Sequence, residues 1–269
     1  MLKKSTIEEL ARRLEESERT RHQIRQFSLE YPEITIEDAY AIQQAWIALK
    51  LAAGRTLKGH KIGLTSKAMQ ASSRIDEPDF GALVDDTFFA DGAEIPFTRF
   101  IVPRVEVELA FVLGKPLGGP NCSIFEVLGA VDYVVPAIEI IDARIDQIDP
   151  KTQTPRKVFD TISDNAACAG IVLGGRPVRP LEIDLRWVAA VLYRNGELEE
   201  SGVAAAVLNH PANGVAWLAN KLAAHGVSLA AGEIILGGSF TRPIAARPGD
   251  VFHADYRQLG SISFRFSRE

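Results

Sequence analysis

Three glutamates in apolar surroundings constrain the fold of this chain more than any other feature. Glu106 and Glu108 alternate with valine and leucine in the run 104–111, and Glu139 stands among valines and isoleucines in the run 133–141. β-Branched residues in such runs favour strands. Because successive side chains of a strand point to opposite faces, Glu106 and Glu108 share one face and the intervening apolar residues face a core.

If these two strands converge, the three carboxylates meet in one place. Burying unpaired carboxylates is costly, and a hard divalent cation that takes oxygen ligands offsets the cost. We therefore predict a Mg²⁺ or Mn²⁺ site formed by Glu106, Glu108 and Glu139. The alternative for the run 104–111 alone is an ordinary half-exposed strand with its glutamates in water, whereas the neighbours of Glu139 leave little room for a solvated face.

Composition excludes several classes of function. The 269 residues suffice for one large domain, or for a domain with a smaller appendage, and the net charge is −5. Without a basic stripe, neither nucleic acid nor an anionic membrane is an expected partner. No apolar run is long enough for a membrane span, and the N-terminus carries no apolar signal core, so we expect a cytoplasmic protein.

The cysteines and histidines disfavour disulfides and a zinc site. Cys122 and Cys168 are far apart in the sequence, and we expect two reduced thiols. The five histidines form no zinc-ligand spacing, which disfavours zinc.

The elements predict an α+β fold with two parts, a helical N-terminal segment over 1–60 and a β-rich catalytic domain over 61–269. In the first part, Ser5 with Glu8 and Thr35 with Asp38 are candidate helix caps. The charge-rich run to residue 25 is interpreted as a solvated helix face.

In the second part, predicted strands lie near 101–113, 133–141, 169–173, 186–194, 233–237 and 260–267. Asn195-Gly196 predicts a hairpin, and helices are expected after Ser123 and after Pro211. Strands and helices do not alternate regularly, which disfavours a doubly wound parallel sheet.

Two further side chains are candidates for acid–base chemistry. Lys61 lies beside Ile62 and Leu64, and a lysine in a partly apolar place can titrate low enough to move protons. Asp79 lies between Pro78 and Phe80, which could desolvate it. Taken alone, each also has a purely structural interpretation: Lys61 as a surface lysine, and Asp79 as an ordinary aspartate in a turn.

Two segments are candidates for substrate contacts. Ser163 and Asn165 belong to a polar stretch that is either a surface loop or a loop lining a site. Gly238 and Ser239 follow an isoleucine-rich strand, where glycines let the backbone approach a ligand and offer N–H groups to a carboxylate.

Together these motifs resemble the fumarylacetoacetate hydrolase superfamily, and within it the hydratase/decarboxylase branch of aromatic meta-cleavage pathways. The resemblance spans nearly the whole chain. It rests on Lys61–Thr65, Pro78–Gly81, Glu106–Glu108, Glu139 and Gly237–Ser239, and on the longer stretches 31–40, 59–70 and 209–221.

The resemblance implies a mixed β-roll with a helical N-terminal segment. It implies Mg²⁺ or Mn²⁺ held by Glu106, Glu108 and Glu139, with Lys61 and Asp79 as catalytic residues beside a small-molecule 2-oxo acid. It also implies a homo-oligomer built from five-fold rings, with a decamer among the expected forms.

The expected reaction is the addition of water to a seven-carbon substrate, 2-oxo-hept-4-ene-1,7-dioate, in aromatic catabolism and specifically in homoprotocatechuate degradation. Its distal carboxylate needs a cation, for which Arg74, Arg144 and Arg242 are candidates that the sequence does not rank. Ser163, Asp164 and Asn165 are candidates for positioning water.

Three alternatives stay open. The first is a 2-oxo-3-enedioate decarboxylase of the same branch, since the same metal chemistry serves loss of carbon dioxide. The second is an acylpyruvate hydrolase, for which His60 lacks an obvious partner acid in the sequence. The third is a non-catalytic metal-binding subunit that stabilises a partner enzyme.

Overall fold

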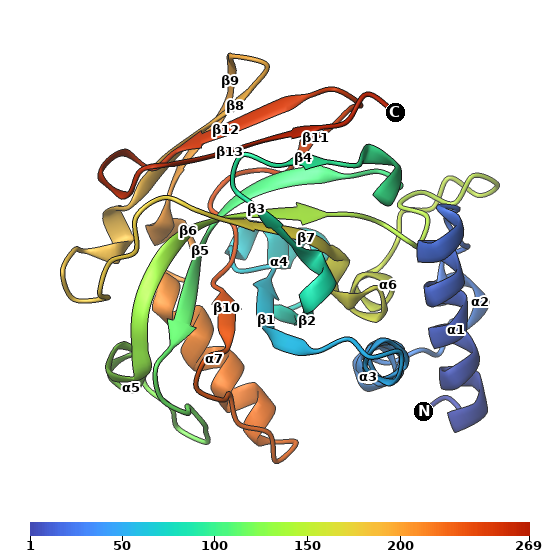
Figure 1. The fold of residues 1–269 in the computed structure, drawn as a ribbon. Coiled ribbons are helices and arrows are strands. Elements are labelled where there is room, and N and C mark those ends of the chain that lie inside the picture. The colour runs from blue at the N-terminus through green and yellow to red at the C-terminus, as the bar shows by residue number, and fades with distance from the viewer.

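A computed structural model describes residues 1–269, and it begins with a helical segment. Helices α1 (Lys4–Thr20), α2 (Phe27–Glu30) and α3 (Ile36–Ala52) lie at one side of the molecule (Figure 1). They enclose a small core of their own. Its buried members are Leu10, Ala11, Leu14, Phe27, Ile34, Ile42, Trp46 and Ile145.

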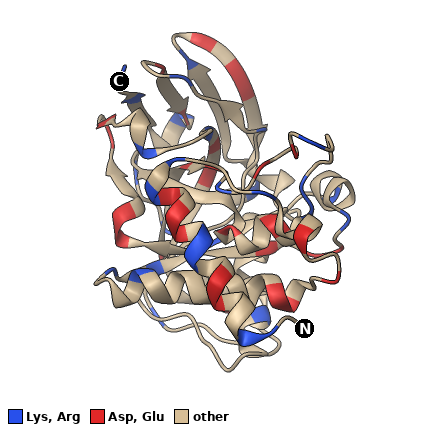
Figure 2. Cartoon of the chain, turned by 90° about the vertical axis from the view of Figure 1, so that its right-hand side faces the viewer, with Lys and Arg blue, Asp and Glu red and all other residues tan.

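Of the two helix caps predicted in this segment, the structure contains one. Thr35 and Asp38 form the predicted capping box, each side chain bonding the backbone of the other. The predicted cap at Ser5 is wrong, because α1 begins at Lys4 and has no side-chain cap. Both signs of charge lie along the helices that face the viewer in Figure 2, consistent with a solvated helix face.

The larger sheet has eight strands. They are β1 (Leu57–Gly63), β2 (Asp79–Val84), β3 (Phe88–Ala90), β5 (Arg104–Leu113), β6 (Val131–Ile141), β7 (Cys168–Leu173), β10 (Ile234–Leu236) and β11 (Ile244–Ala245). Their order is β2-β1-β10-β5-β6-β7-β3, with β11 pairing β5. The long strands β5 and β6 curve through the centre of the molecule (Figure 1).

The smaller sheet has five strands in the order β4-β13-β12-β8-β9. They are β4 (Glu94–Ile95), β8 (Ala189–Arg194), β9 (Glu197–Val203), β12 (Val251–Asp255) and β13 (Ser261–Phe266). The hairpin predicted at Asn195-Gly196 joins β8 to β9, and both of these residues have positive φ as such a turn requires.

Four more helices complete the molecule: α4 (Lys67–Ser73), α5 (Ile124–Ala130), α6 (Val158–Ser163) and α7 (Pro211–Ala223). Helices α5 and α7 are the two helices expected after Ser123 and Pro211. They contribute to the main core together with the smaller sheet. Single turns of 3₁₀-helix punctuate the loops, the one relevant below being η3 (Asn165–Ala167).

The larger sheet has two different faces. Val105, Val107, Leu109 and Phe111 of β5 point into the main core, as the alternation predicts. The opposite face carries the polar residues described below and a small apolar cluster that includes Leu83, Ala110, Val135, Ala137, Cys168, Ile171 and Leu236.

The predicted α+β fold is confirmed, with mixed parallel and antiparallel pairing in both sheets. Residue 60, where the two predicted parts divide, lies inside β1. None of the helices combines the length and apolar character needed to cross a membrane.

Candidate metal and active site

Strand register places the polar candidates on one face of the larger sheet. Glu106 of β5 lies directly opposite Glu139 of β6, and Glu108 lies two residues along from Glu106. On the other side, Ala110 pairs with Leu236 of β10, and Leu236 pairs with Lys61 of β1. Since paired residues share a face, Lys61 joins the glutamates.

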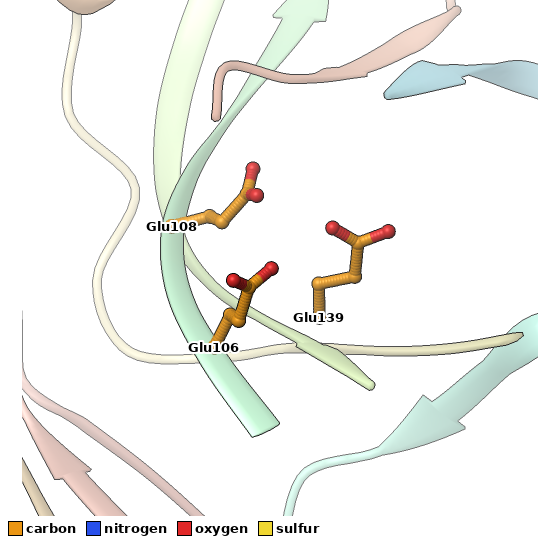
Figure 3. Close-up of side chains that lie close together, drawn as sticks. All are labelled: Glu106, Glu108 and Glu139. Atoms are coloured by element: carbon orange, nitrogen blue, oxygen red, sulfur yellow. The ribbon is translucent and has the colours of Figure 1, made fainter. Parts of the chain in front are cut away.

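The three glutamates converge on one point. One carboxylate oxygen of each lies within 4.8 Å of those of the other two, and the side chains point toward one another in Figure 3. Glu108 and Glu139 are buried, whereas Glu106 is partly exposed. The amide of Gly238 donates to Glu108 Oε2 at 2.9 Å, which fixes that carboxylate.

Electrostatics in this cluster disfavour the fully ionised state of the protein alone. Burial, reinforced by the neighbouring charge of Glu139, raises the pKa of Glu106 to about 7 and raises the pKa of Glu108 well above its usual value. A perturbed set of carboxylates in one place is a mark of a functional site, and a cation between them would reverse the shift.

Lys61 and Asp79 complete the polar face. Burial opposes the charge of Lys61, but the carboxylates of Glu139 and Asp79 outweigh it and raise the lysine pKa. Lys61 Nζ lies 3.1 Å from Glu139 Oε2 and donates to the carbonyl of Ala166 at 3.0 Å. In the protein without the ion, Lys61 therefore carries its charge at neutral pH, opposite to the low pKa expected from its apolar neighbours, because the surrounding carboxylates outweigh burial. Glu139 and the Ala166 carbonyl both hold its ammonium group.

Asp79 opens β2 instead of sitting in a turn. It pairs with Gly63 of β1, and a Cβ at Gly63 would lie 2.3 Å from Asp79 Oδ1, so only glycine leaves room for this carboxylate. Burial raises the pKa of Asp79, against the opposing charge of Lys61. The aspartate is therefore suited to holding a proton beside the lysine.

The residues present fit a divalent cation. Neither carboxylate oxygen of Glu139 accepts a hydrogen bond, although the side chain is fully buried, and Asp79 Oδ1 also lacks a partner. Lys61 Nζ lies 3.1 Å from Glu139 Oε2, and the other buried oxygens are left with room for a further ligand. The donor set of Glu106, Glu108 and Glu139 is all oxygen, the chemistry that Mg²⁺ and Mn²⁺ take.

A strained loop supplies the contact to Lys61. Asn165, Ala166 and Ala167 all have left-handed φ, at 52°, 48° and 65°. Such conformations are costly for residues other than glycine and are kept where the surroundings enforce them. The strain turns the Ala166 carbonyl toward Lys61. The sequence gives no signal for this role, since Asn165-Ala166-Ala167 would also suit a helix.

The four predicted substrate contacts lie in two places. Ser163, at the end of α6, is fully buried and its hydroxyl has no partner, so it remains available. Asn165 instead bonds both backbone groups of Ala82 in β2, at 2.8 and 2.9 Å. Asp164, a candidate for positioning water, is bound by Arg144, whose Nε lies 2.5 Å from it.

Gly238 and Ser239 also make hydrogen bonds within the protein. The amide of Gly238 is occupied by Glu108, and the Ser239 hydroxyl donates to the carbonyls of Thr241 and Val107. A Cβ at Gly238, where φ is 116°, would lie 2.5 Å from a Thr65 side-chain atom. Substrate contacts by these two residues stay predictions.

His60 has the acidic partner that the sequence hides, but on the wrong face. Its Nδ1 lies 3.1 Å from Glu233 Oε2. Because His60 precedes Lys61 in β1, it points to the opposite side of the sheet. The histidine–carboxylate pair needed by the hydrolase alternative is therefore not part of this site.

The chain is similar to known proteins over most of its length. A family model for the C-terminal part of fumarylacetoacetate (FAA) hydrolase matches residues 51–267. The chain is 70% identical over 266 residues to the 2-oxo-hept-4-ene-1,7-dioate hydratase of Escherichia coli, covering 99% of this chain and 100% of that protein.

More distant relatives have other substrates in their names. The 2-keto-4-pentenoate hydratase of Paraburkholderia xenovorans (strain LB400) is 42% identical over 236 residues, covering 88% of this chain and 86% of that protein. The solved 4-oxalocrotonate decarboxylase from Pseudomonas putida G7, complexed with magnesium and adipate, superposes with a TM-score of 0.94. It is 36% identical, and 99% of each chain is covered.

Proposed function

The chain belongs to the fumarylacetoacetate hydrolase family, and from this premise we propose that it is a divalent-metal-dependent hydratase. It would add water to 2-oxo-hept-4-ene-1,7-dioate, taken as its 2-hydroxy-dienoate tautomer, to give 4-hydroxy-2-oxoheptanedioate. The 70% identity to the Escherichia coli enzyme over the full chain supports this substrate.

One observation carries the proposal: three glutamates, a charged lysine and a protonatable aspartate share one face of a sheet in a buried place. Glu106, Glu108 and Glu139 would hold Mg²⁺ or Mn²⁺. The bound ion would orient the C1 carboxylate and C2 oxygen of the substrate and stabilise negative charge there.

The remaining steps fall to the side chains. Lys61 and Asp79 would move the proton of the C2 hydroxyl to C5, which converts the dienol to a 2-oxo-3-enoate. Water then adds across the new double bond, its hydroxyl to C4 and its proton to C3. Ser163, whose hydroxyl is buried and free, would position that water. Gly238 and Ser239 border the glutamates and would contact the substrate carboxylate.

A direct assay tests the proposal. Purified protein is incubated with the seven-carbon and five-carbon 2-hydroxy-dienoates, with Mg²⁺ and with a chelator, and the product is identified by mass. We expect metal-dependent gain of water with the seven-carbon substrate. Absence of turnover on both substrates with Mg²⁺ would favour the non-catalytic subunit instead.

The decarboxylase is the second candidate, favoured by the likeness to the 4-oxalocrotonate decarboxylase structure. The same cation and lysine would stabilise the charge left at C2 when carbon dioxide departs. Measuring carbon dioxide release from a 2-oxo-3-enedioate against water addition separates the two. Release faster than hydration would replace the hydratase proposal.

We also propose a homo-oligomer of five-fold rings, such as a decamer, in the cytoplasm, acting in homoprotocatechuate degradation. The assembly is what the sequence resemblance implies, and the two free, buried cysteines suit a reducing compartment. Light scattering of the purified protein tests the assembly. A monomer at micromolar concentration would refute it.

A further inference from the structure

The glutamate cluster reaches solvent at Glu106. Glu106 is partly exposed, while Glu108 and Glu139 are only 1% and 0% exposed. Arg104 precedes Glu106 by two residues, so it lies on the same face of the strand, and it is also partly exposed. A substrate held at the glutamates can therefore extend toward Arg104.

A second arginine, Arg156, has only a long ion pair with a carboxylate that another arginine already binds. The side chain of Arg156 is only 17% exposed, and its Nη1 has no hydrogen-bond partner. Its nearest carboxylate, Asp164 Oδ2, is 3.8 Å away. Asp164 is already engaged by Arg144, through the guanidinium at 2.5 Å and through the backbone amide at 2.9 Å. Two buried guanidiniums thus share one carboxylate.

Neighbouring groups sharpen this imbalance. Asp160, the other acid whose charge acts on Arg156, is occupied by the amide and hydroxyl of Ser28 and by the amide of Lys157. Burial lowers the pKa of Arg156, and the charges of Arg144 and Arg104 add to this. Two buried guanidiniums that share one carboxylate leave excess positive charge, which an incoming anion would relieve.

Arg156 and Arg104 both bond Gln147. Arg104 Nη2 donates to the Gln147 side chain at 3.2 Å, and the amide of Arg156 donates to the Gln147 carbonyl at 2.9 Å. The positive charge of Arg156 also acts on Asp79. Asp164, whose Oδ2 lies 3.8 Å from Arg156 Nη1, is two residues before Ala166. The Ala166 carbonyl accepts from Lys61, so the guanidinium lies near the polar face of the sheet.

The arginines singled out from the sequence are less suited. Arg144 is consumed by Asp164 and stacks over the Trp46 ring at 5.1 Å. The Arg242 side chain is 85% exposed and bonds Glu200. Arg74 is exposed at the end of α4.

We propose that Arg156, with Arg104 beside it, binds the distal carboxylate of the substrate and makes the enzyme selective for diacids over monoacids. A guanidinium offers paired donors that match a carboxylate. The inference rests on the proposed function for the identity of the substrate, although the binding site itself can be tested apart from turnover.

The test compares a diacid with a monoacid of equal length. Heptanedioate and heptanoate are titrated calorimetrically into Mg²⁺-loaded wild type, Arg156→Gln, Arg156→Lys and the exposed control Arg242→Gln. We expect Arg156→Gln to weaken heptanedioate binding about tenfold or more, and Arg156→Lys to weaken it less. Heptanoate binding should stay within about twofold in all four proteins.

Turnover provides the second readout. Arg156→Gln should raise KM for the seven-carbon dienoate about tenfold or more while leaving the five-carbon dienoate unchanged. Equal heptanedioate affinity in wild type and Arg156→Gln would overturn the inference. If Arg156→Gln does not fold by circular dichroism, Arg156→Lys and Arg104→Gln decide instead, and unchanged diacid selectivity in both would overturn it.

The two proposals fail differently. Loss of diacid binding in Arg156→Gln together with no turnover by wild type would support the carboxylate site and refute the hydratase. Hydration by wild type with unaltered selectivity in Arg156→Gln would refute the site and leave the hydratase intact.

Discussion

Glu139 shows at the scale of one residue how this site differs from an ordinary strand. It is fully buried, neither of its oxygens accepts a hydrogen bond, and Lys61 is its nearest cation. A lone lysine cannot balance Glu106, Glu108 and Glu139 together. The imbalance is what a divalent ion would correct.

Lys61 provides the prediction at this scale. Lys61→Ala should keep Mn²⁺ binding, since the three glutamates remain, and should lower kcat about 10²- to 10⁴-fold because a proton-transfer group is gone. Calorimetry with Mn²⁺ and the dienoate assay measure the two quantities. Wild-type kcat in this variant would remove Lys61 from the mechanism.

The candidate site could be predicted in part from single residues. Alternation in β5 was enough to put Glu106 and Glu108 on one face, and the apolar neighbours of Glu139 indicated burial. Arg156 and Ala166 carry no such signal. Their positions depend on how the segment between β6 and β7 folds back, which is a tertiary effect.

At the scale of elements, the loop from 142 to 157 connects the site to the N-terminal helices. Asp149 caps a turn in this loop by accepting from the amides of Lys151 and Thr152, and it receives a further bond from Arg25 at 2.9 Å. The Thr152 amide, with Arg25, lowers the pKa of Asp149 to about 2.

The lowered pKa predicts a pH dependence. In the unfolded chain an aspartate titrates at about 3.9, so the contribution of Asp149 to stability is fully present above that value and is lost as pH falls toward about 2. Asp149→Asn should therefore be less stable than wild type at pH 7, by a margin that narrows below about pH 4. Urea unfolding at several pH values measures it. A margin independent of pH would contradict this account.

The helices and strands differ in how well the sequence predicts them. The strand predicted near 101–113 is close to the bounds of β5, and the capping box of Thr35 and Asp38 marks the start of α3. Helices α4 and α6 are short and were missed, because packing stabilises them more than their own propensity does. Strand β2 was hidden because Pro78 and Gly81 are typical of a turn.

At the scale of the whole molecule, one sheet separates two environments. The face toward the smaller sheet and α7 is a large apolar core, and the other face holds the carboxylates beside a small cluster of apolar side chains. Folding therefore brings the three carboxylates together, and a cation bound between them would in turn stabilise the fold.

This linkage predicts the effect of metal on thermal unfolding. At a Mg²⁺ concentration of about 100 Kd, the folded state should gain about 2.7 kcal/mol. For a domain of about this size, each kcal/mol raises Tm by about 2–4 °C, so we expect a rise of about 5–11 °C that a chelator reverses. Calorimetric scans with Mg²⁺ and with chelator check it. An unchanged Tm would argue against a metal site formed on folding.

The most direct test of the central claim is Mn²⁺ binding to the wild type and to Glu106→Gln, Glu108→Gln and Glu139→Gln, with the exposed Glu197→Gln as control. We predict one Mn²⁺ per chain in wild type and control, and affinity weakened about tenfold or more in each of the other three, with circular dichroism unchanged. Wild-type affinity for Mn²⁺ in those three variants would contradict the account.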